Sequence, residues 1–225
     1  MQSRLKKIPF LSYFLFLLLI AFSFSSCSKK HPTKPKQALQ RLLKGNKRYV
    51  NNKSEHPNRC KERRKEIASK QTPYAVIVGC SDSRIVPEII FDTGLGDLFV
   101  VRVAGNVIGP IELESIEYSA VNLNSAVIVV LGHENCGAVT AVFQNKATNI
   151  PAVAELIDPA VIQAQDAKNT KNKNQLEQAI KINALNMKHL LEQSPNLETL
   201  IQKKKIQVHA AYYNLKTGLV ELLKD

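Results

Sequence analysis

Three nearly uncharged apolar runs constrain the fold of this chain most. They cover residues 74–78, 98–103 and 125–132 and are rich in β-branched side chains. A strand that is apolar on both faces must be buried on both faces, as in a parallel sheet covered by helices. Helical patterns around 86–91 and 111–121 separate the three runs. The order predicts an α/β fold with a central, mostly parallel sheet and flanking helices.

Two helices are expected before the first apolar run. Apolar side chains recur at helical spacing on one face of residues 37–50, and a strongly charged helix is predicted at 60–69. Neither helix can bury itself alone, so both must pack against the main domain or a partner subunit. The first of them would be an N-terminal helical arm.

The last part of the chain is expected to alternate between helix and strand. The helical segments predicted there are 137–143, 161–165 and 174–192. Two strand-like runs, 206–213 and 219–223, then flank a turn in which Gly218 supplies the backbone conformation. The sequence therefore predicts an antiparallel hairpin at the C-terminal end.

The first residues have the layout of a secretory signal. Lys6 and Lys7 precede an apolar run over 8–24, and Ser25, Ser26 and Cys27 follow it. Small residues directly before a cysteine resemble a bacterial lipoprotein processing box, in which the cysteine is acylated and becomes the new N-terminus. We therefore expect a signal peptide at 1–26, a lipid on Cys27, and a periplasmic protein anchored to a membrane.

Two other interpretations of the leader stay open, namely ordinary signal cleavage and an uncleaved anchor. The apolar run is slightly shorter than the ~20 residues that span a bilayer. Residues 27–36 consist largely of Lys, Pro, Ser and Thr, which is typical of a flexible tether. The folded domain would then cover 37–225.

The formal net charge of +12 is concentrated near the N-terminus, because eight basic residues crowd positions 29–48. A basic segment beside a membrane anchor is attracted to anionic lipid headgroups. Nucleic-acid binding would favour interleaved aromatic residues or a known reading motif, and only Tyr49 is nearby. We therefore expect no nucleic-acid partner.

Chemically active side chains follow the first and third apolar runs. Cys80, Asp82 and Arg84 come directly after the first run, and His133 and Cys136 follow the third. Ligands collect at the carboxyl ends of strands where the strand order reverses in an open α/β sheet. If the second strand lies on one side of the first strand and the third on the other, these two clusters converge.

Two thiolates and one imidazole are a typical ligand set for catalytic zinc, with a fourth position for water or a carboxylate. Cys80, His133 and Cys136 would supply the set. Asp82 could either bind the metal and close the site, or pair with Arg84 and leave a corner open. Zinc lowers the pKa of a water bound at such a corner to about 7.

The remaining cysteine and histidines are interpreted without a ligand role. With Cys27 assigned to lipid, three cysteines are left, and an odd number argues against a complete disulfide framework. Cys60 has no short-spaced partner and is read as a helix-face or buried thiol. The histidines read as non-ligands are His31, His56, His189 and His209.

At these residues the chain resembles the β-carbonic anhydrases. Cys80-Ser81-Asp82-Ser83-Arg84, followed by His133-Glu134-Asn135-Cys136-Gly137, resembles the signature of that family. Segments 38–49, 96–106 and 212–218 are similar to its N-terminal helix, second strand and hairpin, so the resemblance covers about 37–224. Two departures are Glu134, where a small hydroxyl residue is common, and Ala210, where Gly is common.

The resemblance implies one Zn²⁺ per subunit on Cys80, His133 and Cys136, with Asp82 and Arg84 as the dyad that opens or closes the fourth position. It implies a carbonic anhydrase, a zinc lyase that reversibly hydrates carbon dioxide to bicarbonate and a proton by zinc-bound hydroxide. It also implies a homodimer or a dimer of dimers, in which N-terminal helices embrace the other subunit.

Three alternatives remain at this stage. Some relatives of this family keep the metal site but act on carbonyl sulfide or carbon disulfide. A non-catalytic metal-binding or adhesion lipoprotein would have Asp82 permanently on zinc. A dithiol redox function is disfavoured, because Cys80 and Cys136 lack the C-x-x-C arrangement of a dithiol catalyst.

Overall fold

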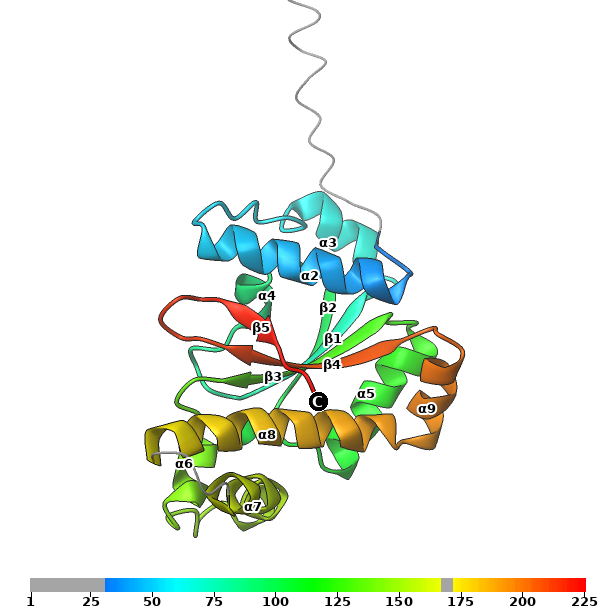
Figure 1. Cartoon of the computed structure of the whole chain (residues 1–225). Coiled ribbons are helices and arrows are strands. Elements are labelled where there is room, and N and C mark those ends of the chain that lie inside the picture. Colours follow the sequence, from blue (N-terminus) through cyan, green and yellow to red (C-terminus); the bar gives the residue numbers. More distant parts are fainter. Residues whose placement is uncertain (1–30, 167–171) are drawn as a thin grey trace, which may run out of the picture.

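The computed structural model describes residues 31–166 and 172–225 (Figure 1). The signal peptide expected at 1–26, the lipid expected on Cys27 and the first residues of the expected tether therefore lie outside the described residues. Within the described ranges, no helix combines the length and the apolar character needed to cross a membrane.

A five-stranded sheet forms the centre of the structure, with strand order β2-β1-β3-β4-β5. The strands are β1 Ala75–Gly79, β2 Leu98–Arg102, β3 Val127–His133, β4 Gln207–Tyr213 and β5 Val220–Leu222. The first four run parallel to one another, and β5 pairs antiparallel with β4. The predicted α/β fold, with a mostly parallel sheet and an antiparallel C-terminal pair, is confirmed.

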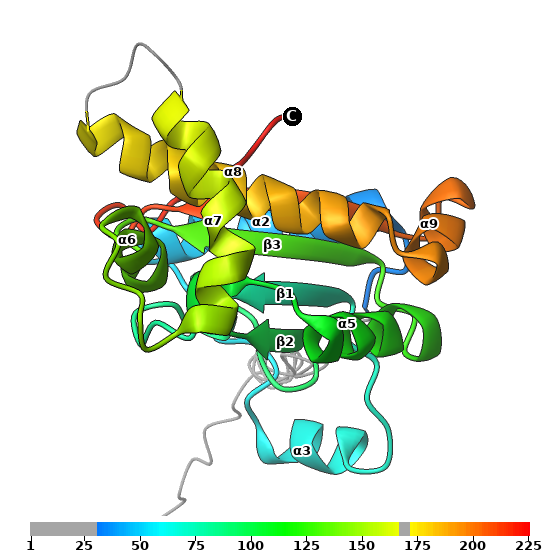
Figure 2. The ribbon, with the colours of Figure 1, turned by 90° about the horizontal axis from the view of Figure 1, so that it is seen from below.

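Helices cover both faces of the sheet (Figures 1 and 2). Helices α2 and α4 pack on one face, and α5 to α9 lie on the other side. The helices are α2 Pro35–Val50, α3 Lys61–Ile67, α4 Pro87–Ile90, the 3₁₀ turn η1 Ala104–Asn106, α5 Pro110–Asn122, α6 Gly137–Phe143, α7 Pro151–Asp166, α8 Asn172–Glu192 and α9 Pro195–Gln202.

The central strands β1 and β3 are buried along their whole length. Successive side chains of a strand point to opposite faces, so Val76 and Val78 join the core under α5 to α9, whereas Ala75 and Ile77 join the core under α2. This double burial is the physical reason for the uninterrupted apolar runs in the sequence. It also makes the central strands a rigid base for the residues that follow them.

The structure corrects three expectations outside the central sheet. Helix α7 begins at Pro151 rather than at 161 and continues through Pro159, because its buried residues Ile157 and Val161 pack on the core. Helix α9 was not predicted, although Ser194 and Pro195 form a regular start of a helix. Cys60 is disulfide-bonded and is not the free thiol expected from the sequence.

Gly45 in α2 lies against the backbone of Phe91, and this contact gives a stability prediction. A Cβ at position 45 would lie 1.8 Å from the Phe91 carbonyl oxygen. Alanine is better than glycine in a helix by about 1 kcal/mol. With alanine at position 45, however, α2 could pack against Phe91 only after a shift of the backbone. We expect Gly45→Ala to lower the free energy of unfolding by about 2 kcal/mol or more, measured by urea denaturation.

The matched control for Gly45→Ala is Gly137→Ala, because no atom of residues 31–166 or 172–225 lies within 4 Å of a Cβ built at Gly137. The control should unfold at the wild-type urea concentration or slightly above it. A Gly45→Ala protein that is as stable as wild type would contradict the observed docking of α2.

Candidate metal centre

Cys80 and His133 are neighbours because their strands are neighbours. Strand β1 lies between β2 and β3, and Gly79 at its end is in register with Leu131 of β3. Cys80 follows β1 directly, His133 is the last residue of β3, and Cys136 is the N-cap of α6. The strand order reverses at β1, which is the point where ligand sites of open α/β sheets are expected.

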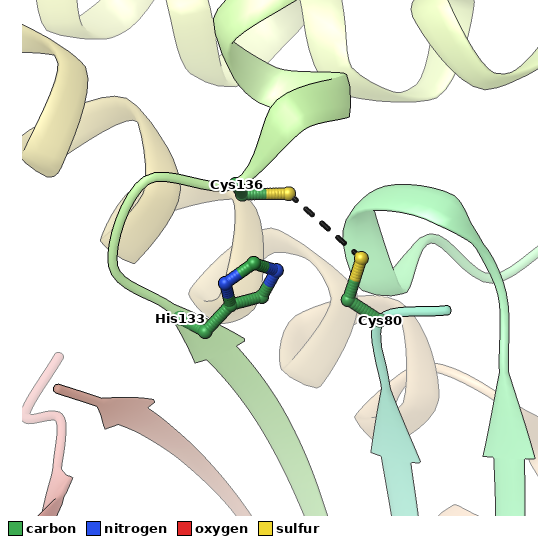
Figure 3. Close-up of side chains that lie close together, drawn as sticks. All are labelled: Cys80, His133 and Cys136. Carbon is green, nitrogen blue, oxygen red and sulfur yellow. Dashed lines mark hydrogen bonds between the residues drawn. The ribbon is translucent and has the colours of Figure 1, made fainter. Parts of the chain in front are cut away.

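The three side chains point toward one another (Figure 3). Their ligand atoms all lie within 4.8 Å of one another, and the Cys80 and Cys136 sulfurs are 4.0 Å apart. All three side chains are buried. The structure therefore brings together the three residues that the sequence analysis proposed as ligands, in an arrangement that could hold a single metal ion.

The His133 ring is oriented with one nitrogen left for a ligand. Its Nδ1 lies 2.9 Å from the carbonyl oxygen of Glu134, an acceptor that requires Nδ1 to carry the proton. Its Nε2 is buried and has no hydrogen-bond partner in the part of the chain that the structure describes. A buried nitrogen without a partner is costly, whereas an imidazole held through its other nitrogen is the usual state of a metal ligand.

The Cys80 sulfur lies where negative charge is stabilised. The pKa of Cys80 is lowered, and the largest cause is the hydrogen bond from the Cys136 thiol. Burial acts in the opposite direction and is outweighed. The backbone N–H groups of Asp82 and Gly105 also donate to this sulfur, at 3.4 and 3.3 Å. The hydrogen bond with Cys80, together with burial, raises the pKa of Cys136. Thiolate is the form that binds zinc, so this environment fits a metal.

Asp82 is paired with Arg84 beside the ligand cluster. Arg84 donates to both carboxylate oxygens, from Nε to Oδ1 at 2.9 Å and from a terminal nitrogen to Oδ2 at 2.6 Å. These hydrogen bonds hold the pKa of Asp82 well below its usual range. Asp82 Oδ2 lies 4.0 Å from His133 Nε2. The carboxylate is thus engaged by the guanidinium while still facing the cluster.

Sequence reasoning missed the residues that support this loop. Arg102 donates to the carbonyl oxygens of Cys80 and Asp82, at 2.9 and 2.8 Å. Asn183 of α8 donates to the Gly105 carbonyl at 2.8 Å, and the Gly105 backbone has a φ of +71°. Arg102 stands out in the sequence as the charge in an otherwise apolar run, which could have indicated its role. Asn183 gives no comparable signal.

Histidines expected to be non-ligands lie outside this cluster. His31 bonds to Asp97 at 2.7 Å, and His189 bonds to Asp225 at 3.1 Å. His209 lies on β4, as the sequence analysis expected for a histidine within a strand. Among the described residues, Cys80, His133 and Cys136 are the group of potential ligands close enough to share an ion.

Comparison with known proteins gives matches to carbonic anhydrases. A protein-family model described as carbonic anhydrase matches residues 75–220. Carbonic anhydrase 2 of Mycobacterium tuberculosis is 52% identical over 109 residues, which are 48% of this chain and 53% of that protein. The chain thus spans about half the length of that relative. A carbonic anhydrase of Pseudomonas aeruginosa is 33% identical over 172 residues, 71% of this chain and 77% of that protein.

Solved structures resemble the chain over more of its length. The crystal structure of the β-carbonic anhydrase CafA of Aspergillus fumigatus matches with a TM-score of 0.65 at 27% identity. The match covers 83% of this chain and 90% of that one. Every residue of the ligand cluster falls within the segment that the family model matches.

Proposed function

The chain belongs to the β-class carbonic anhydrase family, and on this premise we propose that it catalyses the reversible hydration of carbon dioxide to bicarbonate and a proton. One observation carries the proposal. Two buried sulfurs and an unpartnered imidazole nitrogen converge at the strand-order reversal, beside a carboxylate paired with an arginine. This combination would provide both a metal-binding site and a carboxylate placed to accept a hydrogen bond from the reacting water.

Cys80, His133 and Cys136 would hold one zinc ion per subunit. The buried Nε2 of His133, which has no hydrogen-bond partner among the described residues, and the hydrogen bonds to the Cys80 sulfur support this fit. Zinc, when bound, supplies a Lewis acid that lowers the pKa of a water to about 7. The protein contributes the buried position of the three ligands and the hydrogen bonds that orient them.

Asp82 and Arg84 would control access to the cluster. The bidentate ion pair keeps the Asp82 carboxylate on the guanidinium, so the side of the cluster that faces Asp82 is left to the reacting water. Asp82 would accept a hydrogen bond from that water and orient it. Release of Asp82 from Arg84 would allow the carboxylate to become a fourth ligand, which is the closed arrangement. A permanently closed, non-catalytic site is disfavoured by the bidentate pair.

The activity is tested by comparing substrates on the purified protein loaded with zinc. Stopped-flow measurement with a pH indicator should show hydration of carbon dioxide, and carbonyl sulfide should be turned over far more slowly. Turnover of carbonyl sulfide or carbon disulfide without hydration of carbon dioxide would contradict the proposed substrate.

Asp82→Ala tests the role of the carboxylate in orienting the reacting water. Because misplacement of a reacting group can cost about 10²-fold in rate, kcat/KM for hydration should fall by about that factor or more while the zinc content stays at one per chain. Ser83→Ala, at the exposed neighbouring position, is the control and should retain activity. Undiminished hydration in Asp82→Ala would remove Asp82 from the mechanism.

We also propose that the chain assembles as a homodimer or a dimer of dimers. Strand β2 is an edge of the sheet and is only half-buried despite its apolar residues. Nearby on α5, Ile111 is 76% exposed and Tyr118 is 49% exposed. Exposed apolar sheet edges favour association between proteins. A second copy of the chain would cover the edge formed by β2 and α5. Sedimentation analysis should give at least a dimer, and a fully active monomer would contradict the proposal.

The location proposed for the protein is the periplasmic side of a membrane, with a lipid on Cys27. The support is the order of basic, apolar and small residues before Cys27. Cys27→Ala should move the protein from the membrane fraction to the soluble fraction. Acylation and disulfide formation both consume the Cys27 sulfur, and Cys80 and Cys136 are free, so lipidation requires Cys60 to carry a thiol in the mature protein. A mature protein in which Cys60 is joined to Cys27 would contradict lipidation.

A further inference from the structure

Glu134, directly after the metal-binding histidine, joins the ligand loop to the C-terminal hairpin. Its backbone N–H donates to the carbonyl oxygen of Tyr213 at 2.9 Å, and its carboxylate accepts the backbone N–H of Leu215 at 3.1 Å. Its own carbonyl oxygen accepts the proton on His133 Nδ1 at 2.9 Å. One residue therefore bonds both to the hairpin and to the imidazole.

The hairpin itself is firmly held. The Asn214 side chain accepts the backbone N–H groups of Lys216 and Thr217, at 3.0 and 2.9 Å, and so closes the turn between β4 and β5. On the far side of the turn, buried Asn46 of α2 donates to the Gly218 carbonyl at 2.8 Å and accepts the Val220 N–H at 3.0 Å. Leu215 is thus a fixed anchor point for Glu134.

We propose that Glu134 is a positioning residue, whose carboxylate fixes the peptide that holds the His133 ring. The N–H of Glu134 lies in the preceding peptide, so its bond to Tyr213 fixes the main chain before Glu134, and the bond from Leu215 fixes the side chain. Together these bonds hold the Cα from which the peptide to Asn135 extends. The carbonyl oxygen of that peptide is the acceptor for His133 Nδ1. Its orientation therefore decides whether Nε2 faces Cys80 and Cys136.

Loss of the carboxylate should weaken the metal site without removing a ligand. Partners that orient a ligating histidine typically contribute 10- to 100-fold to metal affinity. The contribution of Glu134 requires an oxygen acceptor for the Leu215 N–H, not a negative charge. The amide of glutamine keeps such an oxygen, so the neutral variant separates the hydrogen bond from the electrostatic effect of the carboxylate.

The experiment compares zinc dissociation constants of full-length wild type, Glu134→Ala and Glu134→Gln, determined by competition with a chromophoric chelator. Glu134→Ala should bind zinc about 10- to 100-fold more weakly, and Glu134→Gln should stay close to wild type. The matched control is Glu221→Ala, which removes an exposed carboxylate from the same hairpin, on β5. It should leave zinc affinity unchanged.

Two results would overturn the positioning role. One is wild-type zinc affinity in Glu134→Ala, and the other is an equal loss in Glu134→Gln and Glu134→Ala. Thermal unfolding of the metal-free variants separates loss of metal affinity from loss of folding, and the glutamine variant tests the proposal even if the alanine variant unfolds. The inference rests on the proposed function only for the identity of the metal. Wild-type protein that binds no zinc would instead overturn the proposed function.

Discussion

His133→Ala is expected to abolish both zinc retention and carbon dioxide hydration. Zinc sites with four protein ligands bind with about 10–16 kcal/mol, or roughly 3 kcal/mol per ligand. Loss of one ligand thus weakens binding by two orders of magnitude or more. Here the variant would retain only the two sulfurs, so purified protein should carry well under 0.1 zinc per chain by elemental mass spectrometry. Its hydration rate should match that of buffer.

The control for this substitution is His189→Ala, which removes an exposed imidazole that bonds to Asp225. The control protein should keep one zinc per chain and the wild-type hydration rate. If His133→Ala retained stoichiometric zinc, the ion would have to bind elsewhere, and the ligand assignment would be wrong. Normal hydration in a zinc-free His133→Ala protein would contradict a role for zinc in the reaction.

The centre of the fold and the ligand cluster could be predicted because each signal is contained in a short segment of the sequence. The apolar runs identified the central strands, since burial on both faces leaves no room for polar alternation. The reversal of strand order at β1 then brought Cys80 beside His133, as expected for an open α/β sheet. Local patterns and one rule of topology are sufficient for both predictions.

The supporting contacts could not be predicted because their partners are far apart in the chain. Asn183 reaches Gly105 across 78 positions, and Leu215 reaches Glu134 across 81. Such pairs depend on how α8 and the hairpin pack, and a single sequence carries no record of this. Glu134 was noted only as a departure from the family pattern, and its hydrogen bonds give that departure a physical explanation.

Removal of zinc in the presence of air is expected to inactivate the protein in a way that zinc alone cannot reverse. The Cys80 and Cys136 sulfurs are 4.0 Å apart, and both cysteines are free. They need to approach by about 2 Å to reach disulfide bonding distance. Without an ion between them, dioxygen can oxidise the two thiols to a disulfide and is itself reduced to hydrogen peroxide. The disulfide would remove two of the three ligands.

The measurement is recovery of hydration activity after chelator treatment under air or under nitrogen. Protein stripped under nitrogen should recover with zinc alone, whereas protein stripped in air should recover only after a reductant and then zinc are added. Thiol titration of the unfolded, air-treated protein should show two fewer thiols than the sample kept under nitrogen. Full recovery with zinc alone after air treatment would show that the bound metal does not protect these cysteines.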